Sequence, residues 1–313
     1  ERLMDEAARV SGIDRITLRR KNFVQPSQMP YKNPMGQVYD VGAFEMIMDE
    51  ALQKADWLGF AQREAASKAK GLWRGLGVAT FLEWTGGNAL EENVNVQVLS
   101  DGMIEVTSAV NAMGQGIATS LAQLVVDVFG VDISQVRVIL GDTDRANGFG
   151  SAGSRSLFTG GSAMRVGAEK TLDKARELAG QALEAAPTDL AYQSGNFSVK
   201  GTDLKISLAE LAKKQPNERI EIQSSTTASG PTWPNGCHIC EVEVNPATGE
   251  TQVVSYTSVN DIGRVVNPLI VEGQLDGGAV QGMGQALLEA LVYDPESGQL
   301  VTGSLMDYAA PRA

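Results

Sequence analysis

The chain has 313 residues, enough for one large or two ordinary domains, and 43% of them are hydrophobic. No stretch approaches the roughly 18 consecutive apolar residues of a membrane-spanning helix. The net charge of −12 would repel the phosphates of nucleic acids and of anionic membranes, so neither partner is expected.

The first part of the chain, residues 1–70, is predicted to be a helical connecting segment. An amphipathic helix is expected over residues 1–24, then an extended connection rich in proline, then a helical run over Ala43–Ala69. Three strands are predicted to follow, at Gly75–Glu83, Asn93–Leu99 and Met103–Val110, with an Asp-Gly turn that pairs the last two as a hairpin.

Residues 71–313 are predicted to form one α+β lobe in which a hairpin followed by a helix occurs twice. The first half, about 71–190, continues with the helix Ile117–Phe129, the strand Val136–Leu140 and a long helix that ends near Leu183. The second half, about 220–313, has strands at Cys240–Asn245 and Glu250–Val259, a helix within residues 273–291 and a last hairpin that turns at Pro295 and Gly298. The apolar face predicted for that helix consists of Ala279, Met283, Ala286, Leu287, Ala290 and Leu291. An internal repeat and coincidence both explain this recurrence, since hairpin-then-helix is a common arrangement.

A strand, a tight turn and a helix start meet at Gly114-Gln115-Gly116. The first amides of a helix are unpaired and lie at the positive end of its dipole, so they bind anions. This turn lacks the lysine of a phosphate-binding P-loop and offers an amide side chain instead.

A second candidate is the loop Ser151-Ala152-Gly153-Ser154-Arg155-Ser156, which leads into Thr159-Gly160-Gly161-Ser162. Its hydroxyls, amides and arginine suit a phosphate or a polar ring system, and its glycines allow close approach. An ordinary flexible loop is the competing interpretation.

The last long helix contains four glycines, which have no side chain: Gly277, Gly278, Gly282 and Gly284. Each costs a helix about 1 kcal/mol relative to alanine. Two explanations stay open, close packing on another element or a flat ligand against the helix.

Other groups give weaker signals. The pair in Cys237-His238-Ile239-Cys240 has no second pair to complete a metal site, and it enters a strand, which favours a core role. Glu83, Asp142, Asp261 and Asp307 lie near turns, where carboxylates usually act as caps. No catalytic residue and no protein ligand of a metal is predicted.

Taken together and in order, several segments resemble the large, molybdopterin-binding subunit of the xanthine dehydrogenase and aldehyde oxidase family. They are RGLGVATFLEW, NAMGQGIATSLAQL, VILGDTD, GSAGSRSLFTGGSAM, CEVEVNPATGETQVVSYTSVNDIGRVVNP and VEGQLDGGAVQGMGQALLEAL. The opening ERLMDEAARVSGIDRITLRRKNF resembles the helix that joins the two cofactor-binding lobes of that subunit.

The resemblance implies a set of cofactor-binding residues, with the molybdenum held through the pterin. These are Gly114, Gln115 and Gly116 in the turn; Ser151, Gly153, Ser154 and Arg155 in the loop; and Gln274, Gly277, Gly278 and Gln281 in the last helix. A pterin edge is a row of hydrogen-bond donors and acceptors, and a glutamine amide offers both.

The implied activity is the hydroxylation of a small aldehyde or nitrogen heterocycle with oxygen from water. The cofactor would be molybdopterin, with its cytosine dinucleotide form left open, and 2Fe-2S clusters and FAD would be on partner subunits or domains. A non-catalytic pterin- or nucleotide-binding module is the alternative, and a purely structural interaction domain would leave the glycine clusters unexplained.

The departures from the family are equally specific. Its catalytic glutamate follows a stretch matched here by DYAAPRA, at the end of the chain, and no counterpart of the first lobe is present. The resemblance therefore predicts the second cofactor-binding lobe, truncated at both ends and inactive alone, with exposed apolar surface where the first lobe would pack. Two cysteines and no signal peptide predict a cytoplasmic location, with the periplasm left open.

Overall fold

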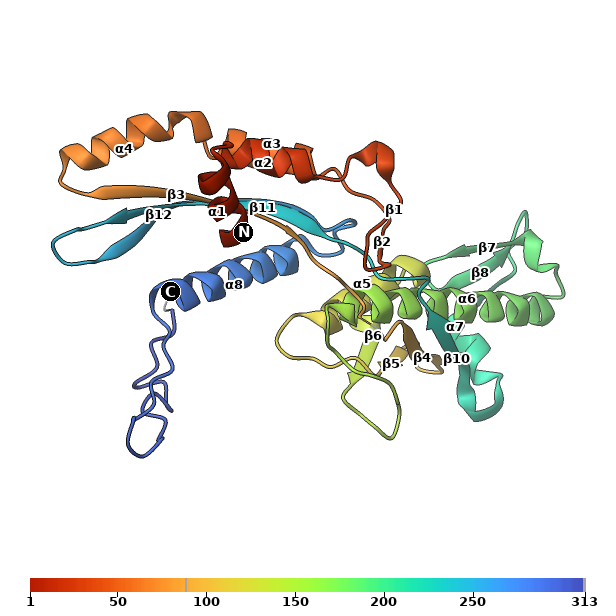
Figure 1. The fold of residues 1–313 in the computed structure, drawn as a ribbon. Helices are drawn as coiled ribbons and strands as arrows, with labels where there is room; N and C mark the ends of the chain where they lie inside the picture. The colour runs from red at the N-terminus through yellow and green to blue at the C-terminus, as the bar shows by residue number, and fades with distance from the viewer. Residues whose placement is uncertain (88, 312–313) are drawn as a thin grey trace. The chain divides into compact units, whose positions relative to one another are not determined.

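The computed structural model describes residues 1–87 and 89–311. The fold consists of two compact units (Figure 1). The terminal unit joins Glu1–Glu83 to Trp233–Ala313, and the central unit is Trp84–Thr232, inserted between those two segments. Each unit has its own hydrophobic core. The division predicted from sequence, at residue 70 and into halves 71–190 and 220–313, partitions the chain differently and stays a prediction.

The terminal unit is built on a three-stranded antiparallel sheet in the order β12-β11-β3. Its strands are β3 (Trp73–Leu82), β11 (Asn235–Val244) and β12 (Thr251–Asp261). Side chains alternate across β11, so Cys237 and Ile239 are buried on the face that α3 contacts. A minor pair, β1 (Tyr31–Lys32) and β2 (Val38–Tyr39), lies in the connection before α3.

The helical regions expected over residues 1–24 and 43–69 are present, but the prediction of one continuous helix in each is wrong. The first is α1 (Arg2–Ser11) and α2 (Arg15–Asn22), separated where Gly12 adopts φ 70° and Asp14 caps the next helix through the amides of Ile16 and Thr17. The second is α3 (Phe44–Lys54) and α4 (Phe60–Ala69), separated at Asp56, which adopts φ 47°. Left-handed backbone ends a helix, as at Gly12; short 3-10 turns lie at Pro26–Gln28 and Trp57–Gly59.

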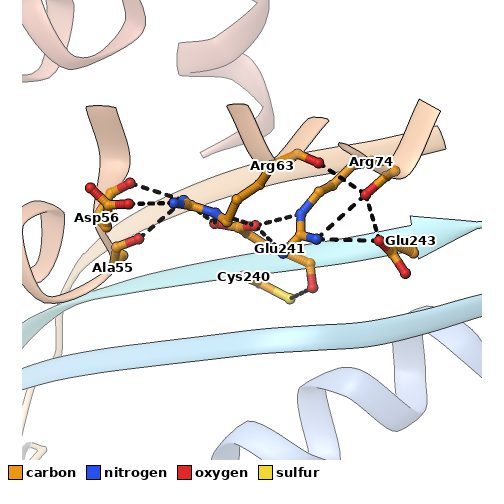
Figure 2. Close-up of polar contacts among 8 residues, drawn as sticks. Ala55, Asp56, Arg63, Arg74, Cys240, Glu241 and Glu243 are labelled. Carbon is orange, nitrogen blue, oxygen red and sulfur yellow. Dashed lines mark hydrogen bonds and ion pairs between the residues drawn. The ribbon is translucent and has the colours of Figure 1, made fainter. Parts of the chain in front are cut away.

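The apolar face of β11 continues into a buried ion network under α4 (Figure 2). Glu241 is 2% exposed, and its carboxylate lies 2.6 Å from Arg63 Nη2 and 2.6 Å from Arg74 Nη2. Arg63 also contacts Asp56 Oδ2 at 2.6 Å, and Arg74 contacts Glu243 Oε1 at 3.2 Å. The network therefore ties α4 and the loop before it to the sheet.

Stability that depends on pH follows from this network. Burial alone would raise the pKa of Glu241, but hydrogen bonds from Arg63 and Arg74 outweigh it and hold that pKa below its ordinary value. A lowered pKa in the folded state means that the stabilisation is complete above the ordinary glutamate pKa, about 4.3, and is lost as the pH falls through the folded-state value. We expect Glu241→Gln to remove this acid-dependent part.

The measurement is the free energy of unfolding in urea, from pH 7 down to pH 3. At pH 7, Glu241→Gln should lower it by about 2–3 kcal/mol, somewhat less than for a fully buried pair because Arg63 is partly exposed. The control is Glu6→Gln, which breaks an exposed pair with Arg9 and should change little. Equal pH dependence in wild type and Glu241→Gln would contradict the assignment.

The central unit is built on a four-stranded sheet in the order β10-β4-β5-β6, with β5 and β6 parallel and the other pairs antiparallel. Its strands are β4 (Glu91–Leu99), β5 (Ile104–Ser108), β6 (Val136–Leu140) and β10 (Arg219–Thr227). The helices α5 (Ile117–Phe129) and α6 (Ser162–Leu183) pack on one face of this sheet and form the larger core with it. A smaller sheet of β7 (Leu190–Gln193), β8 (Asn196–Val199) and β9 (Lys205–Ser207) precedes α7 (Leu208–Lys213).

The predicted α+β class and the two hairpin-plus-helix arrangements are confirmed: β4 and β5 precede α5, and β11 and β12 precede α8 (Pro268–Leu287). The halves also exchange strands. β3 pairs with β11, and β10 pairs with β4, so each sheet contains segments from distant parts of the chain.

The last helix begins and ends earlier than the predicted range of 273–291. Asn267 caps it through the amide of Ile270, and Pro268 occupies its first turn, where proline is favourable. On the predicted apolar face, Ala279 and Met283 are half-buried while Leu287 is 43% exposed, and Ala290 and Leu291 lie beyond the helix. The predicted final turn is present, closed by a bridge between Tyr293 and Leu300.

Exposed apolar side chains lie on and after α8, and the prediction that a first lobe covers such a surface stays a prediction. Its members are Leu269, Val280, Leu287, Leu288, Leu291, Val292, Tyr293, Val301, Leu305 and Met306. Among the described residues, no helix combines the length and the apolarity needed to span a bilayer. The last two residues of the stretch DYAAPRA lie outside the described residues.

Candidate functional site

The turn before α5 is held by the side chain of Gln115. Its Nε2 donates to the carbonyl of Asn111 at 2.8 Å, and its Oε1 accepts from the amide of Met113 at 2.6 Å. Gly114 and Gly116 adopt φ 90° and 73°, which only glycine reaches without strain. Gly116 caps α5 without a side-chain hydrogen bond, so the first amides of the helix are left for a ligand or for water.

The serine-rich loop lies directly against this turn. Ser151 Oγ accepts from the amide of Asn111 at 2.8 Å and donates to its carbonyl at 3.1 Å, and Ser156 Oγ donates to Ser151 Oγ at 2.7 Å. Ser154 adopts a left-handed backbone with φ 58°. The carbonyl of Gly153 accepts from the amide of Gly86 at 2.9 Å, which adds a third glycine-containing segment.

Arg155 does not have the exposed guanidinium that a direct phosphate contact requires. It is fully buried and donates to three carbonyls, of Ala89 at 2.9 Å, Gly150 at 2.5 Å and Glu91 at 2.7 Å. It also forms an ion pair with the equally buried Glu92 at 2.8 Å. The buried side chain holds the loop backbone in place, and a role of Arg155 in binding the cofactor stays a prediction.

Two residues that sequence reasoning missed complete this arrangement. Glu92 Oε1 accepts from Ser108 Oγ and from the amide of Ala109, both at 3.1 Å, so its carboxylate joins the end of β5 to the Arg155 loop. The backbone of Asn111 forms hydrogen bonds with the side chains of both Ser151 and Gln115. The signal for Glu92 was available, since it shares the core-facing alternation of Val94 and Val96 in β4.

The remaining predicted residues lie on α8, in the terminal unit. Gln274, Gly277, Gly278 and Gln281 follow the spacing i, i+3, i+4, i+7 and so share one face of the helix. All four are exposed, and a Cβ added at Gly277 or Gly278 would meet no atom of the described residues within 4 Å. Of the two explanations left open for the glycines, close packing on another described element is not observed at Gly277 or Gly278. Gly284 differs, because its Cβ would collide with Pro311 and Glu289.

The cysteine pair is structural. Cys237 and Cys240 are three residues apart in β11 and so point to opposite faces of the sheet. Burial raises the pKa of Cys237 to about 12 and also raises that of Cys240. His238 is held by Tyr256 Oη at 2.7 Å and Asn260 Oδ1 at 3.1 Å. Within the described ranges, no cluster of three or more His, Cys, Asp or Glu side chains is arranged to hold a metal ion.

The buried pair predicts a large asymmetry between single and double substitutions. Arg155→Met leaves Glu92 as an uncompensated buried charge and should lower the free energy of unfolding by about 3–5 kcal/mol. Adding Glu92→Leu removes that charge and should recover part of the loss, while three carbonyls still lack their donor.

Urea unfolding of the two single variants and the double variant forms a double-mutant cycle that measures this coupling. The matched control is Arg165→Met, which breaks an exposed pair with Glu169 on α6 and should be nearly neutral. Additive effects of Arg155→Met and Glu92→Leu would show that the two side chains are not coupled.

Comparison with known proteins gives a consistent result. Residues 50–313 match a family model described as a molybdopterin cofactor-binding domain. The chain is 33% identical over 334 residues to the nicotine 6-hydroxylase large subunit of Paenarthrobacter nicotinovorans, covering 99% of this chain and 41% of that protein. It is 32% identical over 328 residues to the 6-hydroxypseudooxynicotine dehydrogenase complex subunit gamma of the same organism, covering 100% of this chain and 41% of that protein.

Among solved structures, quinoline 2-oxidoreductase from Pseudomonas putida 86 is similar with a TM-score of 0.87 and 33% identity, over 99% of this chain and 42% of that chain. The chain thus spans about two fifths of the length of the relatives it matches.

Proposed function

Because the chain belongs to the molybdopterin cofactor-binding domain family, we propose that it binds a molybdopterin through three glycine-containing surfaces. These are the turn at Gln115, the loop that begins at Ser151 and the exposed face of α8. The available groups suit this cofactor: amides and hydroxyls match the edge of a pterin, and the uncapped start of α5 suits its phosphate.

The exposed glycine face of α8 carries the proposal. Gly277 and Gly278 lie inside a regular helix, where each glycine is destabilising by about 1 kcal/mol relative to alanine. Neither has a positive φ, and no described atom would obstruct a Cβ at either position. A flat group lying against the helix, with Gln274 and Gln281 beside it, gives these glycines a purpose.

Each part of the chain then has a distinct task. Gln115 keeps the turn in the conformation that presents the helix amides, and Ser151 holds the loop against it. Gln274 and Gln281 have exposed amides that can donate to and accept from a pterin. Arg155 and Glu92 position the loop without touching the ligand.

The activity we propose for the whole protein is that of a molybdenum hydroxylase acting on a small aldehyde or nitrogen heterocycle. The bound cofactor supplies the redox chemistry, with oxygen taken from water, and the chain orients the cofactor. Two relatives are a hydroxylase subunit and a dehydrogenase subunit by name, which favours an enzyme over a non-catalytic pterin- or nucleotide-binding module. None of the described residues is proposed as the catalytic base.

The same comparison supports a proposal of partner subunits. One relative is named as a subunit of a complex and another as a large subunit. We therefore propose partners that carry 2Fe-2S clusters and FAD, and a first cofactor-binding lobe that packs on the apolar surface of α8 and the residues after it. The cytosine dinucleotide form of the cofactor and a cytoplasmic location, where free thiols such as Cys237 persist, complete the proposal.

The α8 face can be tested with one substitution and a control on the same helix. Gly278→Leu places a side chain where the flat group would lie, and we expect the molybdenum content per chain to fall at least tenfold. Gly273→Leu introduces the same side chain about 140° around the helix from Gly278, also into open space, and should leave molybdenum unchanged. The measurement is elemental analysis after expression with the cofactor-assembly machinery, on the chain within the complete protein. Equal loss in both variants would point to helix stability instead.

The turn is tested by Gln115→Ala. Losing both hydrogen bonds frees the turn, and we expect molybdenum content to fall several-fold while the thermal midpoint changes by only a few degrees. Gln181→Ala, on the exposed surface of α6, is the control. Full occupancy in Gln115→Ala would exclude this residue, whereas absence of molybdenum from the wild-type protein would overturn the proposed function itself.

A further inference from the structure

The two sheets that contain the hairpins share one topology as far as β12. In the central unit, the hairpin of β4 and β5 has antiparallel β10 beside its first strand, α5 after its second strand, and parallel β6 on the outer side of β5. In the terminal unit, the hairpin of β11 and β12 likewise has antiparallel β3 beside its first strand and α8 after its second. Among the described residues, no strand takes the place beside β12 that β6 takes beside β5.

The outer edge of β12 has backbone groups without a strand partner. On β3, the carbonyls of Leu76 and Val78 accept from arginine side chains at 2.9 and 3.4 Å, so they face away from β11. Because antiparallel pairs alternate, the register partners of these two residues on β11 bond to β12. The alternate β12 residues, Tyr256 and Ser258, therefore direct their N–H and C=O groups outward, and no described residue outside the sheet bonds to these groups.

The composition of β12 does not protect this edge. Residues Thr251–Asn260 include no charge, no proline and no glycine, and half of them are valine or threonine. The edge strands β3, β6 and β10 each carry an arginine: Arg74, Arg137 and Arg219. Proteins use charges or proline to keep open edges from pairing with other chains, so a long uncharged edge indicates a strand that is normally covered.

We propose that β12 pairs with a parallel strand from the part of the complete polypeptide that follows residue 313. Parallel neighbours need a crossover connection, usually a helix, and α8 follows β12 as α5 follows β5. The described residues after α8 do not supply the strand, since their one bridge joins Tyr293 to Leu300. This chain spans about two fifths of the length of its relatives, so a protein of their length has the residues to do so.

The chemistry of the edge defines the strand that fits it. Main-chain hydrogen bonds supply the pairing, and the uncharged β12 favours an uncharged neighbour rich in valine, isoleucine or aromatic residues. The inference is separate from the proposed cofactor site, because the strand would complete the sheet whether or not a cofactor is bound.

The first test is amide hydrogen exchange on the complete protein, resolved to single residues and corrected for intrinsic rates. The amide of Thr257 faces β11 and is protected in either case. With a paired strand, the amides of Tyr256 and Ser258 should exchange within about tenfold of Thr257, whereas an open edge leaves them roughly a thousandfold faster. Fast exchange at Tyr256 and Ser258 would overturn the proposal.

The second test identifies the strand by photocrosslinking in the complete protein. Ser258→p-benzoylphenylalanine places a reactive group on β12, and we expect it to crosslink one uncharged peptide of the same polypeptide, C-terminal to Ala313, as read by mass spectrometry. The control is the same substitution at Thr248, which is exposed in the turn between β11 and β12 and should not crosslink that peptide. A crosslink to a second copy, to a separate subunit or only within residues 1–313 would overturn the assignment. If the substituted chain does not assemble, exchange in the unmodified protein still decides.

Discussion

The central unit depends on one buried ion pair in its interior. The guanidinium of Arg155 and the carboxylate of Glu92 are both fully buried, and the remaining hydrogen bonds of each go to loop backbone or to Ser108. Removing one member of a buried ion pair is strongly destabilising because the other charge is left uncompensated, and Glu92 Oε2 has Arg155 as its ion-pair partner but accepts no hydrogen bond from a described residue. The loops that lead from residues 86, 109 and 150 are therefore coupled, because a shift in any one of them would leave a charge or a carbonyl unpaired. A candidate site built on these loops gains its rigidity from a side chain that a ligand never touches.

In the terminal unit, the side chains on one face of strand β11 change from polar to apolar and back to polar. On the helix-facing side of β11, an amide at Asn235 is followed by apolar Cys237 and Ile239 and then by Glu241 and Glu243. The acidic end is neutralised by arginines from α4 and β3, and the amide end is buried where β11 pairs with the end of β3. The apolar part of this strand is thus short, and a polar group lies at each of its two ends. The two polar groups differ in how completely they are hydrogen-bonded. The ionic end is fully paired, while the amide end has an acceptor to spare.

The sequence predicted those features that depend on local periodicity. Helix α5 and strand β6 begin and end where their patterns do, since each is a short element bounded by glycine or a capping residue. The breaks at Gly12 and Asp56 were missed because amphipathic periodicity continues across them while the backbone turns left-handed. The exchange of β3 and β10 between sheets was beyond reach, because pairing between strands far apart in the chain leaves no local trace.

The candidate site divides in the same way. Gln115 and Ser151 were identified by residue type and family order, and the structure adds how they hold each other through Asn111. The burial of the Arg155 side chain could not be predicted, because a sequence shows that an arginine is present but not which way it points. Its partner Glu92 resembles any other strand glutamate until burial is known.

The pairing of β3 with β11 has a consequence for how the protein is made. Val78 lies opposite Ile239, so roughly 160 residues separate two neighbours in one sheet. At about 5–20 residues per second, β3 leaves the ribosome roughly 10–30 s before its partner exists. During that interval the central unit has time to complete its own sheet, whose strands all lie within residues 91–227. The sheet of the terminal unit is then completed after that of the central unit, and β3 is the strand that waits longest for its partner.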